Sequence, residues 1–463
     1  MKKANLSWIR PLQEGGGPRY QQITLQIVGA VEDGVLRPGD RLPPQRDLAQ
    51  QFGVDLTTVT RAYSEVRQRG LLEAQGAGGT YIANPGDAET ATIDLGMNIP
   101  PLLNSAAFLQ LLETGSAHAR DHCTSHELMS YHVGAGARRD REAAAQWLKP
   151  MMGALDPERI VICPGAQAAI AALLLVCTQS GDLLVTDEMT YPGFLAAARV
   201  LQREVAGVPS DAEGMDPGAL ERLCEKQRPA LLYLNPTIQN PTTATLSEAR
   251  RRILRDIAAR FSIPIIEDDP YWLLAESAPT PLARLDAPDA AAPVYYISTL
   301  SKCLAPGLRT AYLVVPPAQP VAPVLDALRS LTLMPTPWMT AVATHWIGSG
   351  IADQWLEQVR KELKARQALA ASILPGKLSA DPCGLHLWLQ LPRHIDPYRL
   401  MQTAQQHGLG VSDSDAFAAT DVSPSSIRIS LGGANDQARL AQGLSKLAEL
   451  LRSDVSRRIS NVV

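Results

Sequence analysis

Three shortages in this sequence exclude whole classes of protein. Cysteine is scarce and scattered: the six cysteines form no pair at metal-ligand spacing, so neither a zinc site nor a disulfide framework is expected. Long apolar runs are missing, because the longest, residues 168–178, is too short to span a bilayer. The first residues also lack a basic-then-apolar secretion signal. We therefore expect a soluble cytoplasmic protein with no metal and no membrane partner.

Charge is also sparse. Charged residues make up 19% of the 463 positions and the formal net charge is −4, which does not suggest that the whole chain binds nucleic acid. The distribution is uneven, with 10 Lys and Arg against 8 Asp and Glu over residues 1–84, and 33 against 39 in the remainder. Hydrophobic residues, in contrast, make up 46% of the chain, which is enough for a large core. A length of 463 residues predicts two or three domains.

The first eighty residues show the pattern of three short amphipathic helices. The predicted helices span residues 20–33, 45–52 and 57–69, and a hairpin over residues 71–74 and 80–83 would follow. On the third helix the apolar side chains share one face, whereas Thr57 and Arg61 lie on the opposite face. Two helices joined by a tight turn, with a free polar face, suit the major groove of DNA. A small helical domain with a solvated polar face would show the same pattern.

Several short motifs in this span occur in a fixed order. They are Arg41-Leu42-Pro43, Arg46-Asp47-Leu48-Ala49, Thr57-Thr58-Val59, Arg61-Ala62-Tyr63, Gly70-Leu71-Leu72 and Gly79-Thr80-Tyr81. Residues 1–84 thereby resemble the winged helix-turn-helix domain of GntR-family transcription regulators. The resemblance implies DNA contacts from Arg46, Thr57, Thr58 and Arg61, with a glycine-rich wing at residues 76–79 in the minor groove. Asp55-Leu56 stands where the family usually has Ser-Arg, which should weaken DNA binding generally.

Residues 85–93 are small, polar and turn-forming, and we interpret them as a linker to a second region, residues 94–463. In that region short apolar runs alternate with longer helical stretches. The runs are residues 159–163, 183–186, 230–234, 263–266, 294–297 and 311–315, and the helical stretches include residues 166–179, 217–226 and 247–261. This alternation predicts an α/β domain with a mainly parallel sheet, where sites form at the carboxyl ends of strands.

One lysine falls at such a place. Lys302 follows an apolar run and several hydroxyl residues and precedes a second apolar run, so it should lie on a turn between buried strands. Burial disfavours the ammonium form, and Arg309 nearby would lower the lysine pKa further, as a lysine that condenses with an aldehyde requires. A surface lysine in a loop would have the same local sequence.

Two other segments also follow predicted strands. Gly165 opens a helix whose free N–H groups could bind a phosphate, although strand-glycine-helix is also an ordinary packing arrangement. Asp268 ends an apolar strand, and a carboxylate at that depth needs a cationic partner. That partner could be a pyridinium N–H or the cation of a structural salt bridge.

Taken together, the motifs of the second region follow one order. They are Gly165-Ala166-Gln167, Tyr191-Pro192-Gly193, Gln239-Asn240-Pro241-Thr242, Asp268-Asp269-Pro270-Tyr271, Thr299-Leu300-Ser301-Lys302, Pro306-Gly307-Leu308-Arg309 and Ile427-Arg428-Ile429-Ser430. This order resembles that of fold-type I pyridoxal-phosphate aminotransferases, over nearly all of residues 94–455. The resemblance implies a large domain and a small C-terminal subdomain that starts near residue 330, with pyridoxal 5'-phosphate held covalently by Lys302.

The resemblance also assigns roles by position. The phosphate would be held by Gly165, Ala166, Gln167, Thr299, Ser301 and Arg309. Tyr191 would stack on the ring, Asp268 would pair with the ring nitrogen, and Asn240 and Tyr271 would bind the ring hydroxyl. Tyr131 would reach the phosphate of the partner subunit, and Arg428 would grip an α-carboxylate. Thr243 stands where a glycine usually closes the turn after Asn240, so a positive φ there would be costly.

Some histidines receive no role from these patterns. His118, His122, His126 and His132 cluster without a consistent carboxylate or cysteine partner, and we interpret them as part of a polar loop. His386 alternates within a strand-like segment and is expected to be structural.

A winged helix joined to an aminotransferase-like domain resembles the MocR-type (GabR-like) subfamily of GntR regulators. The resemblance implies a homodimeric transcription regulator that binds a double-stranded DNA operator. Pyridoxal phosphate or an amino compound would be its effector and would change how the DNA-binding domains are presented. The alternative is an active aminotransferase with an accessory DNA-binding domain, because Lys302, Asp268 and Arg428 would also serve a transamination half-reaction. In a third interpretation the large domain is only a dimerisation scaffold.

Overall fold

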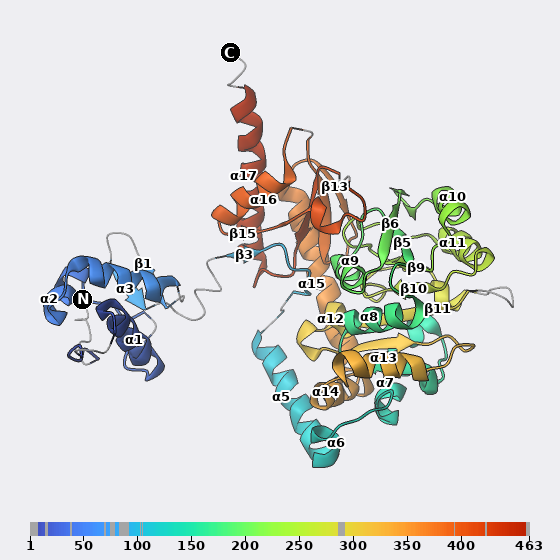
Figure 1. The fold of residues 1–463 in the computed structure, drawn as a ribbon, viewed down its shortest axis with the longest axis horizontal. Coiled ribbons are helices and arrows are strands. Elements are labelled where there is room, and N and C mark those ends of the chain that lie inside the picture. The colour runs from blue at the N-terminus through green and yellow to red at the C-terminus, as the bar shows by residue number, and fades with distance from the viewer. Residues whose placement is uncertain are drawn as a thin grey trace. The chain divides into compact units, whose positions relative to one another are not determined.

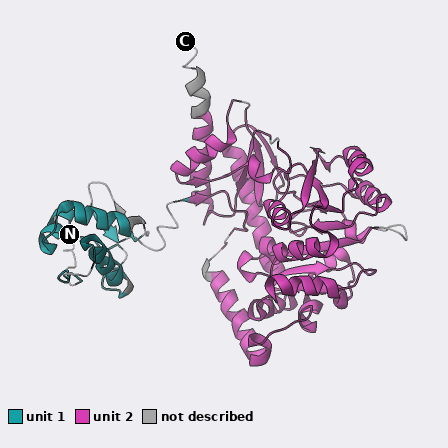
Figure 2. Cartoon of the chain, viewed as in Figure 1, with its two compact units in different colours: residues 1–92 teal, residues 93–463 magenta. Residues whose placement is uncertain are grey.

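The computed structural model forms two compact units, Met1–Thr92 and Ile93–Val463 (Figures 1 and 2). The structure describes residues 8–13, 17–37, 39–68, 71–74, 79–82, 92–101, 103, 105–285, 292–392, 394–421 and 424–459. Within these ranges, no helix combines the length and the apolar character needed to cross a membrane.

The first unit contains three helices and a two-stranded sheet. The helices are α1 (Arg19–Glu32), α2 (Gln45–Phe52) and α3 (Leu56–Gln68), and β1 (Leu72–Ala74) pairs antiparallel with β2 (Thr80–Ile82). Gly53 ends α2 in the left-handed conformation, with φ 63°, which turns the chain into α3. The side chains at the centre of the unit are fully or almost fully buried: Ile23, Ile27, Leu48, Val59, Ala62, Tyr63 and Val66. The predicted helix-turn-helix is confirmed, and the predicted wing residues 76–78 lie outside the described residues.

A seven-stranded sheet forms the centre of the second unit, in the order β4-β12-β11-β10-β9-β5-β6. The strands are β4 (Ile160–Cys163), β5 (Leu183–Asp187), β6 (Glu204–Val208), β9 (Leu231–Leu234), β10 (Ile265–Asp268), β11 (Val294–Thr299) and β12 (Ala311–Val314). Only β12 runs antiparallel to its neighbours in this sheet, so the predicted mainly parallel sheet is confirmed. All residues of the central strands are buried, because helices cover both faces.

Neighbouring side chains along each strand enter different cores. Ile266 packs with helices α8 (Ala166–Cys177) and α9 (Pro192–Val200) on one face, whereas Ile265 packs with α10 (Pro217–Gln227) and α11 (Glu248–Arg260) on the other. Tyr296 of β11 joins a third core with α7 (Arg138–Met152) and α14 (Pro337–Gly348). The helices and remaining short elements are α5 (Ser105–His122), α6 (Ser125–Met129), α7 (Arg138–Met152), η2 (Pro157–Arg159), α8 (Ala166–Cys177), α9 (Pro192–Val200), β7 (Ser210–Asp211), β8 (Gly214–Met215), α10 (Pro217–Gln227), α11 (Glu248–Arg260), η3 (Leu282–Arg284), α12 (Leu300–Cys303), η4 (Pro306–Leu308), α13 (Ala322–Thr332) and α14 (Pro337–Gly348).

A smaller four-stranded sheet, in the order β13-β14-β17-β16, lies toward the end of the chain (Figure 1). Its region contains α15 (Ile351–Ile373), β13 (Lys377–Ala380), β14 (His386–Gln390), α16 (Pro397–Gln406), β15 (Leu409–Gly410), β16 (Ser412–Asp413), η5 (Ser414–Phe417), β17 (Ser426–Ser430) and α17 (Gln437–Ile459). The short strand β3 (Ile93–Asp94) pairs parallel with β15, so the first residues of this unit join the core of its last residues. This pairing brings the segment after β3 close to Lys302.

The expected polar histidine loop is wrong for three of the four histidines, whereas His132 lies in the loop between α6 and α7. His118 and His122 lie on α5, and His126 lies on α6. The ring of His118 stacks on that of His122, with 4.0 Å between centroids, and on that of His345 from α14, with 3.8 Å. No local pattern indicated His345 as a partner, because it lies more than two hundred positions away.

Candidate functional site

A cavity lies at the carboxyl ends of β10 and β11. It is lined by Ala166, Tyr191, Asn235, Asn240, Asp268, Pro270, Tyr271, Thr299 and Lys302. All but Asn235 and Pro270 were predicted from the sequence as cofactor-binding residues. The carboxyl ends of parallel strands share one edge of the sheet, so residues far apart in the chain meet there.

Lys302 lies on α12, a single helical turn between β11 and β12, where the sequence predicted a turn. Thr299 caps this helix by accepting a hydrogen bond from the Ser301 N–H at 3.2 Å. The Lys302 Nζ donates to the backbone oxygen of Asn98. The pKa of Lys302 is lowered to about 8, mainly by burial and next by the nearby Arg428 cation. Arg309 lowers this pKa by a smaller amount, whereas Asp268 raises it. The amine is therefore closer to its uncharged form than a surface lysine is.

Asp268 ends β10 and is 4% exposed. Its Oδ2 accepts a hydrogen bond from Tyr233 Oη at 2.7 Å, whereas its Oδ1 is buried and has no hydrogen-bond partner among the described residues. Burial raises the Asp268 pKa to about 6, against the opposing effects of Tyr233 and Lys302. A buried acceptor without a donor, on the wall of a cavity, fits a ligand that carries an N–H. The buried ion pairs of this strand involve Glu267 and Asp269 instead.

The start of α8 and Arg309 form a cradle beside the cavity. Gly165 has a φ of +96°, and a Cβ at this position would lie 2.5 Å from Arg309 Nη2, so a side chain here would displace the guanidinium. Arg309 donates from Nη2 to the Pro164 backbone oxygen at 3.1 Å and is exposed on its other side. The guanidinium and the N–H groups that open α8 together suit an anion such as a phosphate.

Hydroxyl and amide groups complete the cradle. Thr299 Oγ1 lies 3.1 Å from Ser301 Oγ, and both residues are buried. Gln167 Nε2 donates to the Gly193 backbone oxygen at 2.7 Å, and its Oε1 is buried without a hydrogen-bond partner among the described residues.

Arg428 lies on β17 of the small sheet, is 7% exposed, and contacts the cavity through its lining residue Asn240. Its Nη1 donates to Asn240 Oδ1 at 2.8 Å, and its Nη2 donates to the Gly96 backbone oxygen. The guanidinium carbon lies 4.8 Å from the centre of the Phe417 ring. Two of its donor groups thus point at acceptors that a carboxylate could replace.

The turn after Asn240 has the strained residue that the sequence indicated. Thr243 adopts a φ of 66°, a region that favours glycine, and its N–H donates to the Gln239 backbone oxygen at 2.7 Å. Burial and this hydrogen bond hold the threonine in place.

Sequence reasoning missed several residues of this site. Asn235 links two of its loops, because its Nδ2 donates to the Asp268 backbone oxygen at 2.6 Å and its Oδ1 accepts from the Asn240 N–H at 2.8 Å. Tyr233 and Asn98 also contact site residues directly. A tyrosine and an asparagine at the end of an otherwise apolar strand were a usable signal for Tyr233 and Asn235. No local pattern marked Asn98.

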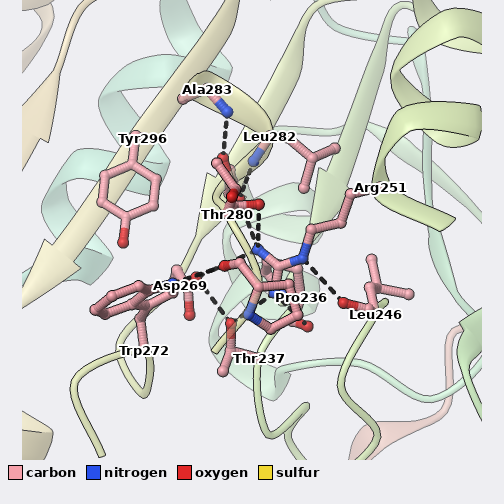
Figure 3. Close-up of polar contacts among 12 residues, drawn as sticks. Pro236, Thr237, Leu246, Arg251, Asp269, Trp272, Thr280, Leu282, Ala283 and Tyr296 are labelled. Atoms are coloured by element: carbon pink, nitrogen blue, oxygen red, sulfur yellow. Dashed lines mark hydrogen bonds and ion pairs between the residues drawn. The ribbon is translucent and has the colours of Figure 1, made fainter. Parts of the chain in front are cut away.

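Arg251 of α11 lies in a buried polar cluster that includes Asp269, the residue after Asp268 (Figure 3). Its Nη1 lies 3.5 Å from Glu267 Oε1 and 3.9 Å from Asp269 Oδ2, and its Nη2 donates to Thr237 Oγ1 at 2.9 Å and to the Pro236 backbone oxygen at 3.1 Å. Burial raises the Asp269 pKa to about 8, and the Arg251 cation opposes this rise. Arg251 therefore ties the loop after β9 to the end of β10, where Asp268 lies.

Tyr131 does not line the cavity of its own chain. It is 77% exposed and borders a separate cavity with His132, Gly136 and Met334.

The predicted DNA-contacting residues lie on α2 and α3 of the first unit. Arg46, Thr57 and Arg61 are exposed, and Thr58 is half-buried. The Arg61 guanidinium lies over the Tyr20 ring at 4.0 Å and donates to Tyr20 Oη at 3.3 Å. This contact holds the guanidinium against α1.

Comparison with known proteins assigns both units. The family "Aminotransferase class I and II" matches residues 90–447, and "Bacterial regulatory proteins, gntR family" matches residues 19–82. The chain belongs to the class I and II aminotransferase family. Its fusion to a GntR-type helix-turn-helix domain is the MocR-type architecture.

Relatives of this MocR-type chain show the same combination. The uncharacterized HTH-type transcriptional regulator YdeF of Bacillus subtilis is 28% identical over 457 residues, 96% of this chain and 97% of the relative. The probable rhizopine catabolism regulatory protein MocR of Rhizobium meliloti is 26% identical over 85% of this chain and 86% of its own.

Solved structures match the aminotransferase unit. Pyrococcus horikoshii kynurenine aminotransferase has a TM-score of 0.70 and 25% identity, covering 79% of this chain and 91% of its own. The α-aminoadipate aminotransferase LysN of Thermus thermophilus has a TM-score of 0.71 and 22% identity, covering 85% and 99%.

Class I and II aminotransferases use pyridoxal phosphate, and the residues of this MocR-type chain fit it. The unpaired Asp268 Oδ1 suits a ring N–H, and the cradle at Gly165 and Arg309 suits the phosphate. When bound, the cofactor supplies an electron sink for an amino compound. Lys302 would carry protons at its Nζ, and Asp268 would hold the proton on the ring nitrogen.

Proposed function

We propose that this chain is a pyridoxal-phosphate-dependent transcription regulator that senses the cofactor or an amino compound. One observation carries the proposal: the same chain has a helix-turn-helix unit with exposed Arg46 and Arg61 and a second unit whose cavity fits the cofactor. An enzyme acting alone would have no use for the first unit.

The effector fits a carboxylate-bearing amine. Arg428 donates to Asn240 Oδ1 and to the Gly96 backbone oxygen, two acceptors that an incoming carboxylate would replace. Lys302 donates to the backbone oxygen of Asn98, only two residues after Gly96. An effector carboxylate bound to Arg428 would therefore free the Gly96 backbone oxygen from the guanidinium. Such a change alters DNA binding only if the effector prefers one arrangement of the protein over the other.

We also propose that the protein acts as a homodimer in the cytoplasm and binds a two-part operator. Tyr131 supports a dimer because it is exposed in its own chain, as expected of a residue that completes the neighbour's phosphate site. Met129 and Val133, on either side of it, are 77% and 55% exposed, which suits a surface covered by a second copy.

A joint titration tests this proposal. The purified protein is titrated with pyridoxal phosphate and then with a panel of amino acids, while the visible spectrum and binding to its own promoter DNA are followed together. The expected result is a spectral change and a change in DNA affinity at the same effector concentration. A spectral change with unaltered DNA binding would contradict the sensing proposal.

An active aminotransferase is the second candidate. It is favoured by the presence of Lys302 with a pKa near 8, Asp268 and Arg428 around one cavity. Steady formation of keto acid from an amino acid, over many turnovers per subunit, would support it. A single half-reaction per subunit would support the regulator.

A further inference from the structure

Two buried residues at the edge of the cavity have no role in the assignments above. Asn98 is 5% exposed, and His386, the first residue of β14, is fully buried. They lie 288 positions apart and meet next to Tyr271, the predicted ligand of the cofactor ring hydroxyl. Asn98 Nδ2 lies 2.9 Å from Tyr271 Oη and 3.1 Å from His386 Nδ1.

The hydrogen bonds of His386 fix its tautomer. Burial, followed by the nearby Arg428 cation, lowers the His386 pKa to about 3, so the imidazole is neutral and has a single N–H. His386 Nε2 lies 3.3 Å from the Gln239 backbone oxygen, which can only accept. The N–H is therefore on Nε2, and Nδ1 is an acceptor.

An accepting Nδ1 fixes the orientation of the Asn98 amide in turn. With Nδ2 toward His386, the amide donates to Nδ1, whereas the flipped amide would place Oδ1 against another acceptor. The second hydrogen of Asn98 Nδ2 then points at Tyr271 Oη. An amide nitrogen does not accept hydrogen bonds, so the Tyr271 hydroxyl hydrogen must point elsewhere. Burial raises the Tyr271 pKa and keeps this hydrogen in place.

We propose that Asn98 and His386 are positioning residues that hold the Tyr271 hydroxyl as a donor toward the ring oxygen of the bound cofactor. Tyr271 lines the cavity beside Lys302, so its free hydrogen is available there. A donated hydrogen bond stabilises the anionic form of the ring oxygen, so the network lowers the pH at which the bound cofactor loses its proton. The inference rests on the cofactor part of the proposed function and is independent of the DNA-binding part.

The test is a pH titration of the visible absorbance of the protein loaded with pyridoxal phosphate. Tyr271→Phe removes the donor and is expected to raise the midpoint by about one pH unit or more. Asn98→Leu and His386→Leu leave the hydroxyl in place but release its orientation, so each is expected to raise the midpoint by a smaller amount. Midpoints equal to that of the wild type in both leucine variants would overturn the inference.

A double variant separates positioning from general damage. If Asn98 acts through the Tyr271 hydroxyl, Asn98→Leu added to Tyr271→Phe leaves the midpoint where Tyr271→Phe alone puts it. Additive shifts would overturn the inference. His386→Asn keeps an acceptor close to the position of Nδ1 and is expected to retain the wild-type midpoint, unlike His386→Leu.

Gln367 supplies the matched control. Its Nε2 donates to the backbone oxygens of Gly384 at 2.7 Å and His386 at 3.1 Å, so Gln367→Leu loosens the same strand without removing any side-chain hydrogen bond of the network. This variant is expected to lower the melting temperature and leave the midpoint unchanged. A midpoint shift as large as that of His386→Leu would assign the effect to the strand and overturn the inference. A wild-type protein that takes up no cofactor would overturn the cofactor assignment itself, which is a distinguishable failure.

Discussion

The two candidate sites place similar side chains in opposite environments. On α2 and α3 of the first unit, Arg46 and Arg61 extend from exposed positions. In the second unit, Asp268 and Lys302 line a cavity, Arg428 is buried beside it, and each contacts a group from another element. Exposed cations bind a polyanion through long-range attraction, whereas buried groups act by geometry and shifted pKa values.

This difference predicts different responses to substitution. Changes in the exposed site should alter binding and leave the fold nearly intact. Changes among the buried groups should alter chemistry, stability or both, because a charge left unpaired in the interior is costly.

The largest effect is expected from substitution of Lys302, which tests whether the site binds the cofactor covalently. Lys302→Ala removes the only amine that lines the cavity in the described part of the chain. Covalent attachment of pyridoxal phosphate should be lost completely, measured by the visible spectrum and by mass after borohydride reduction. Binding to promoter DNA in the absence of effector should persist. Attachment at full stoichiometry in this variant would refute the role of Lys302.

Two arginine variants test whether buried charges contribute more to the stability of the fold than exposed charges do. Arg251→Met leaves the Glu267 and Asp269 carboxylates buried without their cation and is expected to cost about 3–5 kcal/mol in the free energy of unfolding, measured by urea denaturation. The neighbouring Arg252 is the control. It is 48% exposed in its side chain and pairs with Glu248, so Arg252→Met should cost only about 0.5 kcal/mol. Equal losses in the two variants would contradict the assigned role of the buried cluster.

The pH dependence of cofactor uptake tests the environment of Lys302. Its pKa of about 8 lies below its ordinary value of 10.5, so the reactive uncharged amine forms as pH rises through 8. The uncharged fraction is about one tenth at pH 7 and about nine tenths at pH 9. The initial rate of pyridoxal-phosphate attachment to the cofactor-free protein should therefore rise about tenfold over this range and then level off. A rate that keeps rising toward pH 10.5 would indicate a solvated lysine.

The smallest effect is expected at Arg61 and tests the exposed site. Arg61→Ala removes one predicted phosphate contact, so promoter binding should weaken by several-fold and the salt dependence should fall by about one unit in slope. Loss of the contact with Tyr20 should cost about 0.5–1 kcal/mol of stability. The visible spectrum with cofactor should be unchanged. Arg37→Ala, at an exposed position outside α2 and α3, is the control and should alter the salt slope less.

Much of the fold could be predicted because its signals are local. The helix-turn-helix followed from apolar spacing that ends at Gly53, and the mainly parallel sheet followed from short apolar runs between helical stretches. Lys302 and Asp268 were predictable because a polar residue at the end of a buried strand is conspicuous. The direction of the Lys302 pKa shift was predictable from burial and Arg309. Arg428 lowers this pKa more than Arg309 does, but its proximity to Lys302 became evident only from the fold.

Other features depended on contacts between distant segments. Asn98 meets His386 across 288 positions, His118 stacks on His345 of another helix, and Arg251 joins two loops that its own helix does not contain. Spacing within one helix or strand carries no information about such partners.

The sequence by itself determined the two kinds of unit, the order of their elements and most of the residues that line the cavity, because periodicity and turn chemistry act over a few residues. Only the tertiary structure decided which donor faces which acceptor in the buried cavity. Hydrogen bonds act over about 3 Å, and the chain reaches that distance between remote residues only after it has folded.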